Sequence, residues 1–249
     1  MTDNHIHIGQ FREVYYEPCE ILDIIAEAGV TDAVYTSTTS AKDGVRYAEV
    51  EREIAGAAAL YDPERYKPFL WFIPPYIDQR LDIGEAFHSL PYAGIKLHPR
   101  AHHWDLGDRR HLDCLHSIFA FADENALPVL IHTGEDVFER PGYFADFFSR
   151  YFGARCILAH CRPVIEAIAL FRHHRNVYGD TAFLPLEGAA EIINAGFTTR
   201  LLPGSDFPIT HYMATHYGNN NGSNDKLADQ YLKDIEQMKK CEEMINQGR

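Results

Sequence analysis

The chain has 249 residues, of which 46% are apolar and 24% are charged. This composition is typical of a globular protein and excludes a disordered or fibrous chain. Its 23 basic and 36 acidic side chains give a formal net charge of −13, which argues against nucleic acid or an anionic membrane as a partner. The sequence has no run of about 18 apolar residues, so no membrane span is predicted.

The N-terminal segment and the cysteines both indicate a cytoplasmic protein. Residues 1–9 do not combine a basic segment with a following apolar one, so no signal peptide is predicted. The five cysteines include no CxxC pair and are expected to be reduced thiols.

Short β-rich runs alternate with longer segments of helical periodicity. In chain order, the predicted elements are a strand at Asn4–Ile8, a helix from Pro18 to Gly29, strands at Asp32–Ser37, Pro68–Ile73 and Gly94–His98, a helix at Leu112–Ala122, a strand at Val129–Thr133, a helix at Tyr143–Phe152, a strand at Cys156–His160, a helix at Val164–Phe171, a strand at Asn176–Gly179, a helix at Leu186–Ala195, a strand at Arg200–Gly204 and a charged helix at Asp225–Gln247.

This alternation predicts a parallel sheet, because parallel neighbours need a crossover connection between them. Eight strands in a chain of this length favour a closed (β/α)8 barrel over an open doubly wound sheet. No change of composition divides the chain, so residues 1–249 are expected to form a single domain. The Gly- and Asn-rich stretch 217–224 is predicted to be a mobile loop, a connector or a lid.

Two histidines lie on the first predicted strand. His5 and His7 point to the same face, whereas Ile6 and Ile8 point to the opposite one. Two neutral imidazoles on one inward face are suitable ligands for zinc and related metals. The pair alone fits a hydrogen-bonded structural role equally well.

Polar residues recur where other predicted strands end. They are Lys96 and His98 on the fourth strand, His132 on the fifth, His160 on the sixth and Asp206 after the eighth. Burying such side chains is costly unless they are paired or bound to metal. Barrel chemistry lies at the carboxyl ends of the strands, so these residues are expected to converge with His5 and His7 on one site.

Together these residues resemble the site of the metal-dependent amidohydrolase superfamily, and the stretches 3–9, 94–99, 132–134 and 204–208 are similar to its amidohydrolase-related (amidohydrolase 2) branch. Members of that superfamily bind one or two divalent metals at the mouth of a (β/α)8 barrel. The resemblance implies zinc as the cofactor. The implied ligands are His5, His7, Lys96, His132, His160 and Asp206.

The resemblance also implies a role for each ligand. His5, His7 and His132 would hold an ion that lowers the pKa of bound water to roughly 7. Asp206 would orient that water and act as general base. His160 would bind a second metal or polarise the reacting group of the substrate.

Lys96 has two interpretations, because an ammonium is repelled by a nearby dication. Its amine could be carboxylated and bridge two metals, as in dihydroorotase-like members of the superfamily. It could instead stay protonated and bind a substrate carboxylate beside a single metal. The carboxylated or metal-proximal form is the favoured one.

Three further residues are candidate substrate contacts: His98, Arg100 and Arg162. The alternatives are a supporting role for His98 and exposed charges for the two arginines. Glu135 and Asp136 follow the fifth strand, where a helix N-cap is the favoured role for Asp136.

Three functions are compatible with these residues. The leading hypothesis is a metal-dependent hydrolase of a small polar or carboxylated amide, lactone or ester. The second is a non-oxidative decarboxylase that uses the same metal site, and the third is a metal-binding barrel without turnover. The chain leaves little length for loops, so the pocket is expected to be shallow or completed by a second subunit in a homo-oligomer.

Overall fold

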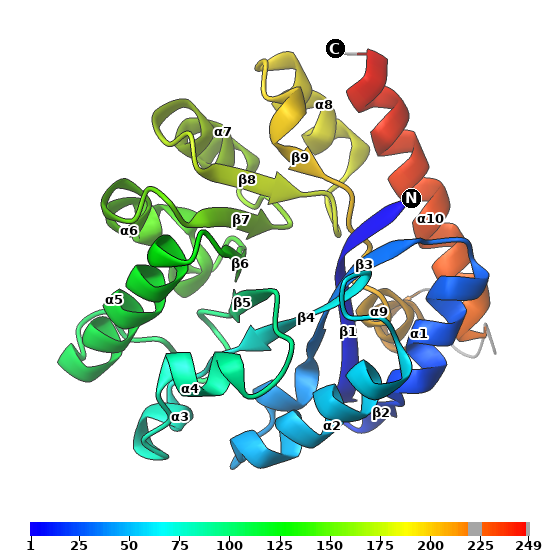
Figure 1. Cartoon of the computed structure of the whole chain (residues 1–249). Helices are drawn as coiled ribbons and strands as arrows, with labels where there is room; N and C mark the ends of the chain where they lie inside the picture. Colours follow the sequence, from blue (N-terminus) through cyan, green and yellow to red (C-terminus); the bar gives the residue numbers. More distant parts are fainter. Residues whose placement is uncertain (219–225, 248–249) are drawn as a thin grey trace.

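The computed structural model describes residues 1–218 and 226–247. Within these residues, nine strands form one curled sheet in the order β2-β1-β3-β4-β5-β6-β7-β8-β9, with the helices around its outside (Figure 1). The parallel strands are β1 (Thr2–Phe11), β3 (Asp32–Ser37), β4 (Tyr66–Trp71), β5 (Gly94–Leu97), β6 (Pro128–His132), β7 (Arg155–Ala159), β8 (Val177–Asp180) and β9 (Leu201–Leu202). The short strand β2 (Val14–Tyr16) is antiparallel to β1 and forms a hairpin with it.

Backbone contacts between the two ends of the sheet close it into a barrel. Ile6 of β1 forms a parallel bridge with Phe207, which follows β9. The backbone N–H of Asp206 donates to the carbonyl of His5 at 2.8 Å. Because eight parallel strands take part, the predicted (β/α)8 architecture is confirmed, and the open sheet is not formed.

Ten α-helices occur within the described residues, and most of them cover the outside of the barrel. They are α1 (Pro18–Glu27), α2 (Tyr47–Leu60), α3 (Pro75–Asp78), α4 (Ile83–His88), α5 (Arg109–Glu124), α6 (Ala145–Arg150), α7 (Val164–His173), α8 (Leu186–Asn194), α9 (Ile209–Tyr217) and α10 (Leu227–Gln247). The final helix α10 contacts α1, α8 and α9, so it covers the place where the barrel closes (Figure 1).

Hydrophobic periodicity identified six of these helices, but α2, α3, α4 and α9 were not predicted. The missed helix α2 buries Tyr47, Val50, Ile54 and Ala57 on one side. Its other face carries several alanines and Gly56, so the contrast between its apolar and polar faces is weak. The predicted loop at 217–224 falls largely outside the described residues, apart from Tyr217 and Gly218 at the end of α9.

Two apolar cores pack on the two faces of the curled sheet. The outer one lies between strands and helices and contains Ile6 and Ile8, as predicted. The inner one fills the barrel with Val34, Phe69, Leu130, Ile157 and Ala159. Since apolar side chains fill this part of the interior, the inward-facing polar residues are left for the carboxyl ends of the strands.

Candidate metal centre

Residues from the two ends of the chain meet at the mouth of the barrel. The Nε2 atoms of His7 and His5 lie 2.9 and 3.1 Å from Asp206 Oδ1. All three residues are buried. The backbone of Asp206 is left-handed, with φ of 64°, a conformation that L residues rarely adopt and that is concentrated at functional sites.

Lys96 lies beside this group at the end of β5. Its Nζ is 3.1 Å from His5 Nε2, and the residue is only 1% exposed. Burial lowers the pKa of Lys96 to about 8, although Asp206 and Asp180 oppose the shift. A lowered pKa increases the fraction of neutral amine, which is the form that reacts with carbon dioxide.

The two remaining predicted ligands face each other on the next strands. His160 Nε2 is 3.1 Å from His132 Nδ1. His132 is the last residue of β6, whereas β7 ends at Ala159, one residue before the predicted end. Ile157 and Ala159 already point into the barrel, so strict alternation would turn His160 outward. Its left-handed backbone, with φ of 69°, instead brings the imidazole into the site.

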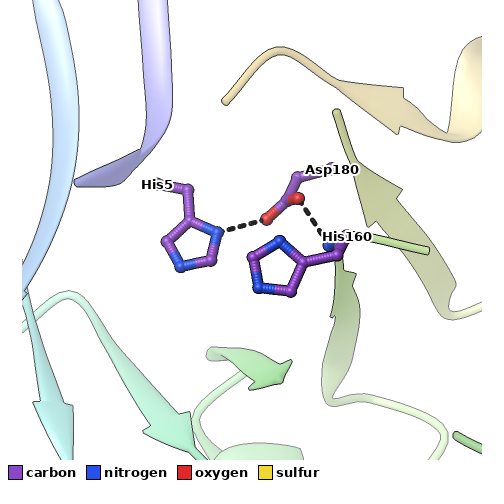
Figure 2. A group of neighbouring side chains, drawn as sticks. All are labelled: His5, His160 and Asp180. Carbon is purple, nitrogen blue, oxygen red and sulfur yellow. Dashed lines mark hydrogen bonds and ion pairs between the residues drawn. The ribbon is translucent and has the colours of Figure 1, made fainter. Parts of the chain in front are cut away.

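Asp180, at the end of β8, fixes the orientation of His5. Figure 2 shows its carboxylate between the His5 ring and the backbone of His160. Oδ2 lies 2.8 Å from His5 Nδ1, and Oδ1 accepts from His160 N at 2.8 Å. Burial alone would raise the pKa of Asp180, but His5 and His160 lower it below its ordinary value. An ionised carboxylate only accepts hydrogen bonds, so His5 Nδ1 carries the proton and Nε2 presents a lone pair.

His7 and His160 are oriented in a similar way. The Nδ1 of His160 is 2.9 Å from the carbonyl oxygen of Ala182, which again leaves a lone pair on Nε2. His7 Nδ1 lies 2.8 Å from the hydroxyl of Thr36. Such contacts to the outer nitrogen are the usual support of metal-binding histidines.

The residues present fit a divalent metal. Burial lowers the pKa of His5 and His7, and it lowers that of His160 to about 4, so the imidazoles are neutral at neutral pH. Burial alone would raise the pKa of Asp206, but His5 and His7 hold it well below its usual range. The lone pair of His5 Nε2 faces the ionised Asp206 carboxylate at 3.1 Å, which favours a cation between them, and His7 Nε2 lies 2.9 Å from the same oxygen.

A cavity of about 440 Å³ opens above this group. His98 and Arg100, two of the predicted substrate contacts, line it together with His7, Lys96, His132 and Asp206. The His98 ring stacks between those of His132 and Trp71, with centroid distances of 3.8 and 5.5 Å. Arg162 does not line this cavity, and its backbone N–H donates to Thr133 Oγ1, so its role in substrate binding stays a prediction.

Several residues of the site were not identified in the sequence, among them Asp180, Trp71 and Glu139. Asp180 is the last residue of β8, but the predicted strand ended one residue earlier, at Gly179, so the search for polar residues at strand ends did not include it. Trp71 also ends a strand, but an aromatic residue there is typical of a core as well. Glu139 lines the cavity, yet it comes seven residues after His132, where neither strand nor helix periodicity points to it.

Comparison with known proteins agrees with this geometry. The sequence profile of the amidohydrolase family matches residues 3–222. The chain therefore belongs to this family, whose members are enzymes that use a divalent metal. Among proteins of curated function, none matches the sequence significantly.

Several solved structures share the fold. A probable 2-pyrone-4,6-dicarboxylic acid hydrolase from Acinetobacter baumannii, with citric acid bound, has a TM-score of 0.60 and 13% identity over 99% of this chain and 96% of its own. A 4-oxalomesaconate hydratase from Rhodopseudomonas palustris has a TM-score of 0.54 and 13% identity over 95% and 88% of the two chains. A manganese complex of 5-carboxyvanillate decarboxylase from Novosphingobium aromaticivorans has a TM-score of 0.55 and 13% identity over 88% and 76%. At these identities the likeness shows the fold alone.

Proposed function

We propose that this protein is a metal-dependent hydrolase of a small carboxylated amide, lactone or ester. One observation carries the proposal. His5, His7 and Asp206 are brought together from opposite ends of the chain, and Asp180 and Thr36 orient the two imidazoles so that their Nε2 atoms face the carboxylate.

His5, His7 and His132 would hold the metal, which we propose to be zinc, with His160 and Lys96 beside it. A bound divalent metal lowers the pKa of water, so that hydroxide is available near neutral pH. Asp206 is ionised there, since its pKa is held low, and its carboxylate can orient the water and accept its proton. The neutral His160 can donate or accept a hydrogen bond at the reacting group of the substrate.

Two arginines line the cavity and support a carboxylated substrate. They are Arg12 on the β1–β2 hairpin and Arg100 after β5. Arginine binds carboxylates in a bidentate manner, which fixes a substrate in one orientation. The names of two structural neighbours also describe carboxylated substrates, a pyrone dicarboxylate and a carboxyvanillate.

The second candidate is a non-oxidative decarboxylase at the same site. It is favoured by the buried Lys96 beside His5, because a protonated lysine could hold the carboxylate that is to be removed. A carboxylated Lys96 would instead favour hydrolysis. Mass spectrometry of the native protein under mild conditions, with and without bicarbonate, distinguishes a carbamate from a free amine.

The proposed activity is tested with the Zn²⁺-loaded protein and a panel of carboxylated lactones, esters and amides, with release of acid as the readout. We expect turnover by the wild-type protein and its loss in Asp206→Asn. Glu135→Gln is the matched control, because Glu135 is an exposed carboxylate on the loop after β6. Release of carbon dioxide in place of acid would establish the decarboxylase, and no turnover of any such substrate would support a barrel without catalysis.

We also propose that the protein is a homo-oligomer in the cytoplasm. Light scattering in solution tests the oligomeric state.

A further inference from the structure

Glu139 lies on the outer side of His132. Its Oε1 is 3.4 Å from His132 Nε2, while His132 Nδ1 faces His160 Nε2 at 3.1 Å. The Glu139 side chain is only 8% exposed. The two nitrogens of the His132 ring therefore face different groups. Nδ1 faces His160, another proposed metal ligand, and Nε2 faces the buried carboxylate of Glu139.

The backbone after β6 turns back to bring Glu139 to this position. Gly134 N donates to the Glu139 carbonyl at 3.1 Å, and Glu139 N donates to the Asp136 carbonyl at 2.9 Å. A Cβ at Gly134 would collide with the Glu139 carboxylate, so only glycine leaves room for it. These bonds involve the backbone, and a change of the Glu139 side chain leaves them in place.

The surroundings make His132 the nearest partner of this carboxylate. Arg100 Nη1 is 3.8 Å from Glu139 Oε1, but it is closer to the exposed Asp136, at 3.0 Å. Stacking on His98, with an angle of 12° between the rings, fixes the plane of the His132 ring. Since the plane of the ring is fixed, the two neutral forms of His132 differ only in which nitrogen carries the proton.

We propose that Glu139 is a positioning residue that keeps the proton of His132 on Nε2, so that the Nδ1 lone pair faces the metal-binding side. A neutral imidazole carries one N–H, which can donate either to the Glu139 carboxylate or to the neutral His160 Nε2. His160 Nε2 is the nearer acceptor, at 3.1 Å against 3.4 Å for Glu139 Oε1. Burial raises the pKa of Glu139, but Arg100 opposes this shift and favours the ionised carboxylate. A hydrogen bond to an ionised acceptor is about twice as strong as one to a neutral acceptor, and on this ground we assign the proton to the Glu139 side. A consequence of this role for catalysis rests on the proposed function, whereas the effect of Glu139 on the position of the His132 proton does not.

A competing interpretation makes Glu139 a metal ligand itself. His98, His132 and Glu139 offer ligand atoms within 4.8 Å of one another and could hold an ion at the mouth of the barrel. An ion there would need the same His132 Nε2 that Glu139 faces, and it would lie close to the Arg100 guanidinium. The geometry favours the positioning role, and a count of bound metal separates the two.

The test uses Glu139→Ala and Glu139→Gln, with Glu135→Gln as the matched control, because Glu135 is an exposed carboxylate on the same loop. The first readout is the tautomer of His132 in the metal-free protein, from ¹⁵N NMR shifts. The second is the affinity and stoichiometry of Zn²⁺ by isothermal titration calorimetry. In Glu139→Ala we expect the proton of His132 to move to Nδ1 and the Zn²⁺ affinity to fall about 10- to 100-fold. In Glu139→Gln the amide oxygen can still accept from Nε2–H but lacks the charge that decides the competition, so both readouts should lie between those of wild type and Glu139→Ala. The control Glu135→Gln should leave both readouts unchanged.

The proposal is overturned if Glu139→Ala keeps the wild-type tautomer of His132. It is also overturned if Glu139→Ala loses one whole equivalent of Zn²⁺ with the tautomer unchanged, because Glu139 would then be a ligand. A wild-type protein that binds no Zn²⁺ would contradict the proposed function alone, since the tautomer of the metal-free protein would still decide the role of Glu139.

Discussion

Replacing Asp180 with asparagine should switch His5 to its other tautomer with little change of shape. Asp180 Oδ1 accepts from the backbone N–H groups of His160 and Ala182 at 2.8 and 3.1 Å, and Oδ2 accepts from His5 Nδ1 at 2.8 Å. In Asp180→Asn one oxygen remains, and the two backbone donors compete with His5 for it.

The number of hydrogen bonds decides which way the new amide points. With its oxygen on the backbone donors, the amide keeps two hydrogen bonds of about 1 kcal/mol net each, and its NH₂ faces His5. The reverse orientation would leave two buried N–H groups unsatisfied, at about 1–3 kcal/mol each. The amide therefore donates to His5 Nδ1, the proton of the ring moves to Nε2, and the proposed metal-binding lone pair is lost.

We expect the Zn²⁺ affinity of Asp180→Asn to fall at least 10- to 100-fold, which corresponds to about 1.4–2.8 kcal/mol. Calorimetric titration of Zn²⁺ measures this change, and circular dichroism checks that the variant folds. Glu135→Gln serves as the control, because it removes an exposed carboxylate on the loop after β6. A folded Asp180→Asn protein that binds Zn²⁺ as tightly as wild type would refute the reasoning.

Three further predictions concern stability and the loop after β6. Burial holds the pKa of His160 at about 4 against 6.5 in the unfolded chain, so its contribution to the stability of the metal-free protein is present above pH 6.5 and lost as the pH falls to 4. This amounts to about 3 kcal/mol at about 1.4 kcal/mol per pKa unit, and equal urea midpoints at pH 7 and pH 4.5 would argue against it. Burial raises the pKa of Asp234 to about 7, although Thr210 and Gln230 oppose the shift, so the native state favours the protonated form and loses stability as the pH rises from 4 to 7. In thermal unfolding, the stability of Asp234→Asn relative to wild type should therefore increase from pH 5 to pH 8. A stability difference that does not change with pH would exclude ionisation of Asp234 as the cause. Gly134→Ala should displace the Glu139 carboxylate and weaken Zn²⁺ binding as Glu139→Ala does. Unchanged Zn²⁺ binding in a folded Gly134→Ala protein would show that the position of Glu139 does not depend on a glycine at residue 134.

The sequence predicted the barrel because each strand combines a short β-rich run with a nearby breaker, and all eight parallel strands were placed to within a few residues. Helices were predicted where their apolar face contrasts with a polar one, as in α5. They were missed where small residues blur that contrast, as in α2, or where the element is as short as α3.

The site was predictable wherever strand geometry alone decides where a side chain points. His5 and His7 follow this rule, as do Lys96 and His132. His160 reaches the site through a left-handed backbone, which alternation does not foresee. Glu139 depends on how a loop folds back past Gly134, so its place follows from tertiary structure and not from a local pattern.

The proposed activity requires an ion held by His5, His7 and Asp206. Elemental analysis of the purified native protein, with Zn²⁺ titration of its chelator-treated form, tests this most directly. We expect one or two equivalents of divalent metal in the wild-type protein, removal by a chelator and restoration by Zn²⁺. A correctly folded wild-type protein that is purified without metal and shows no heat of Zn²⁺ binding would contradict the account.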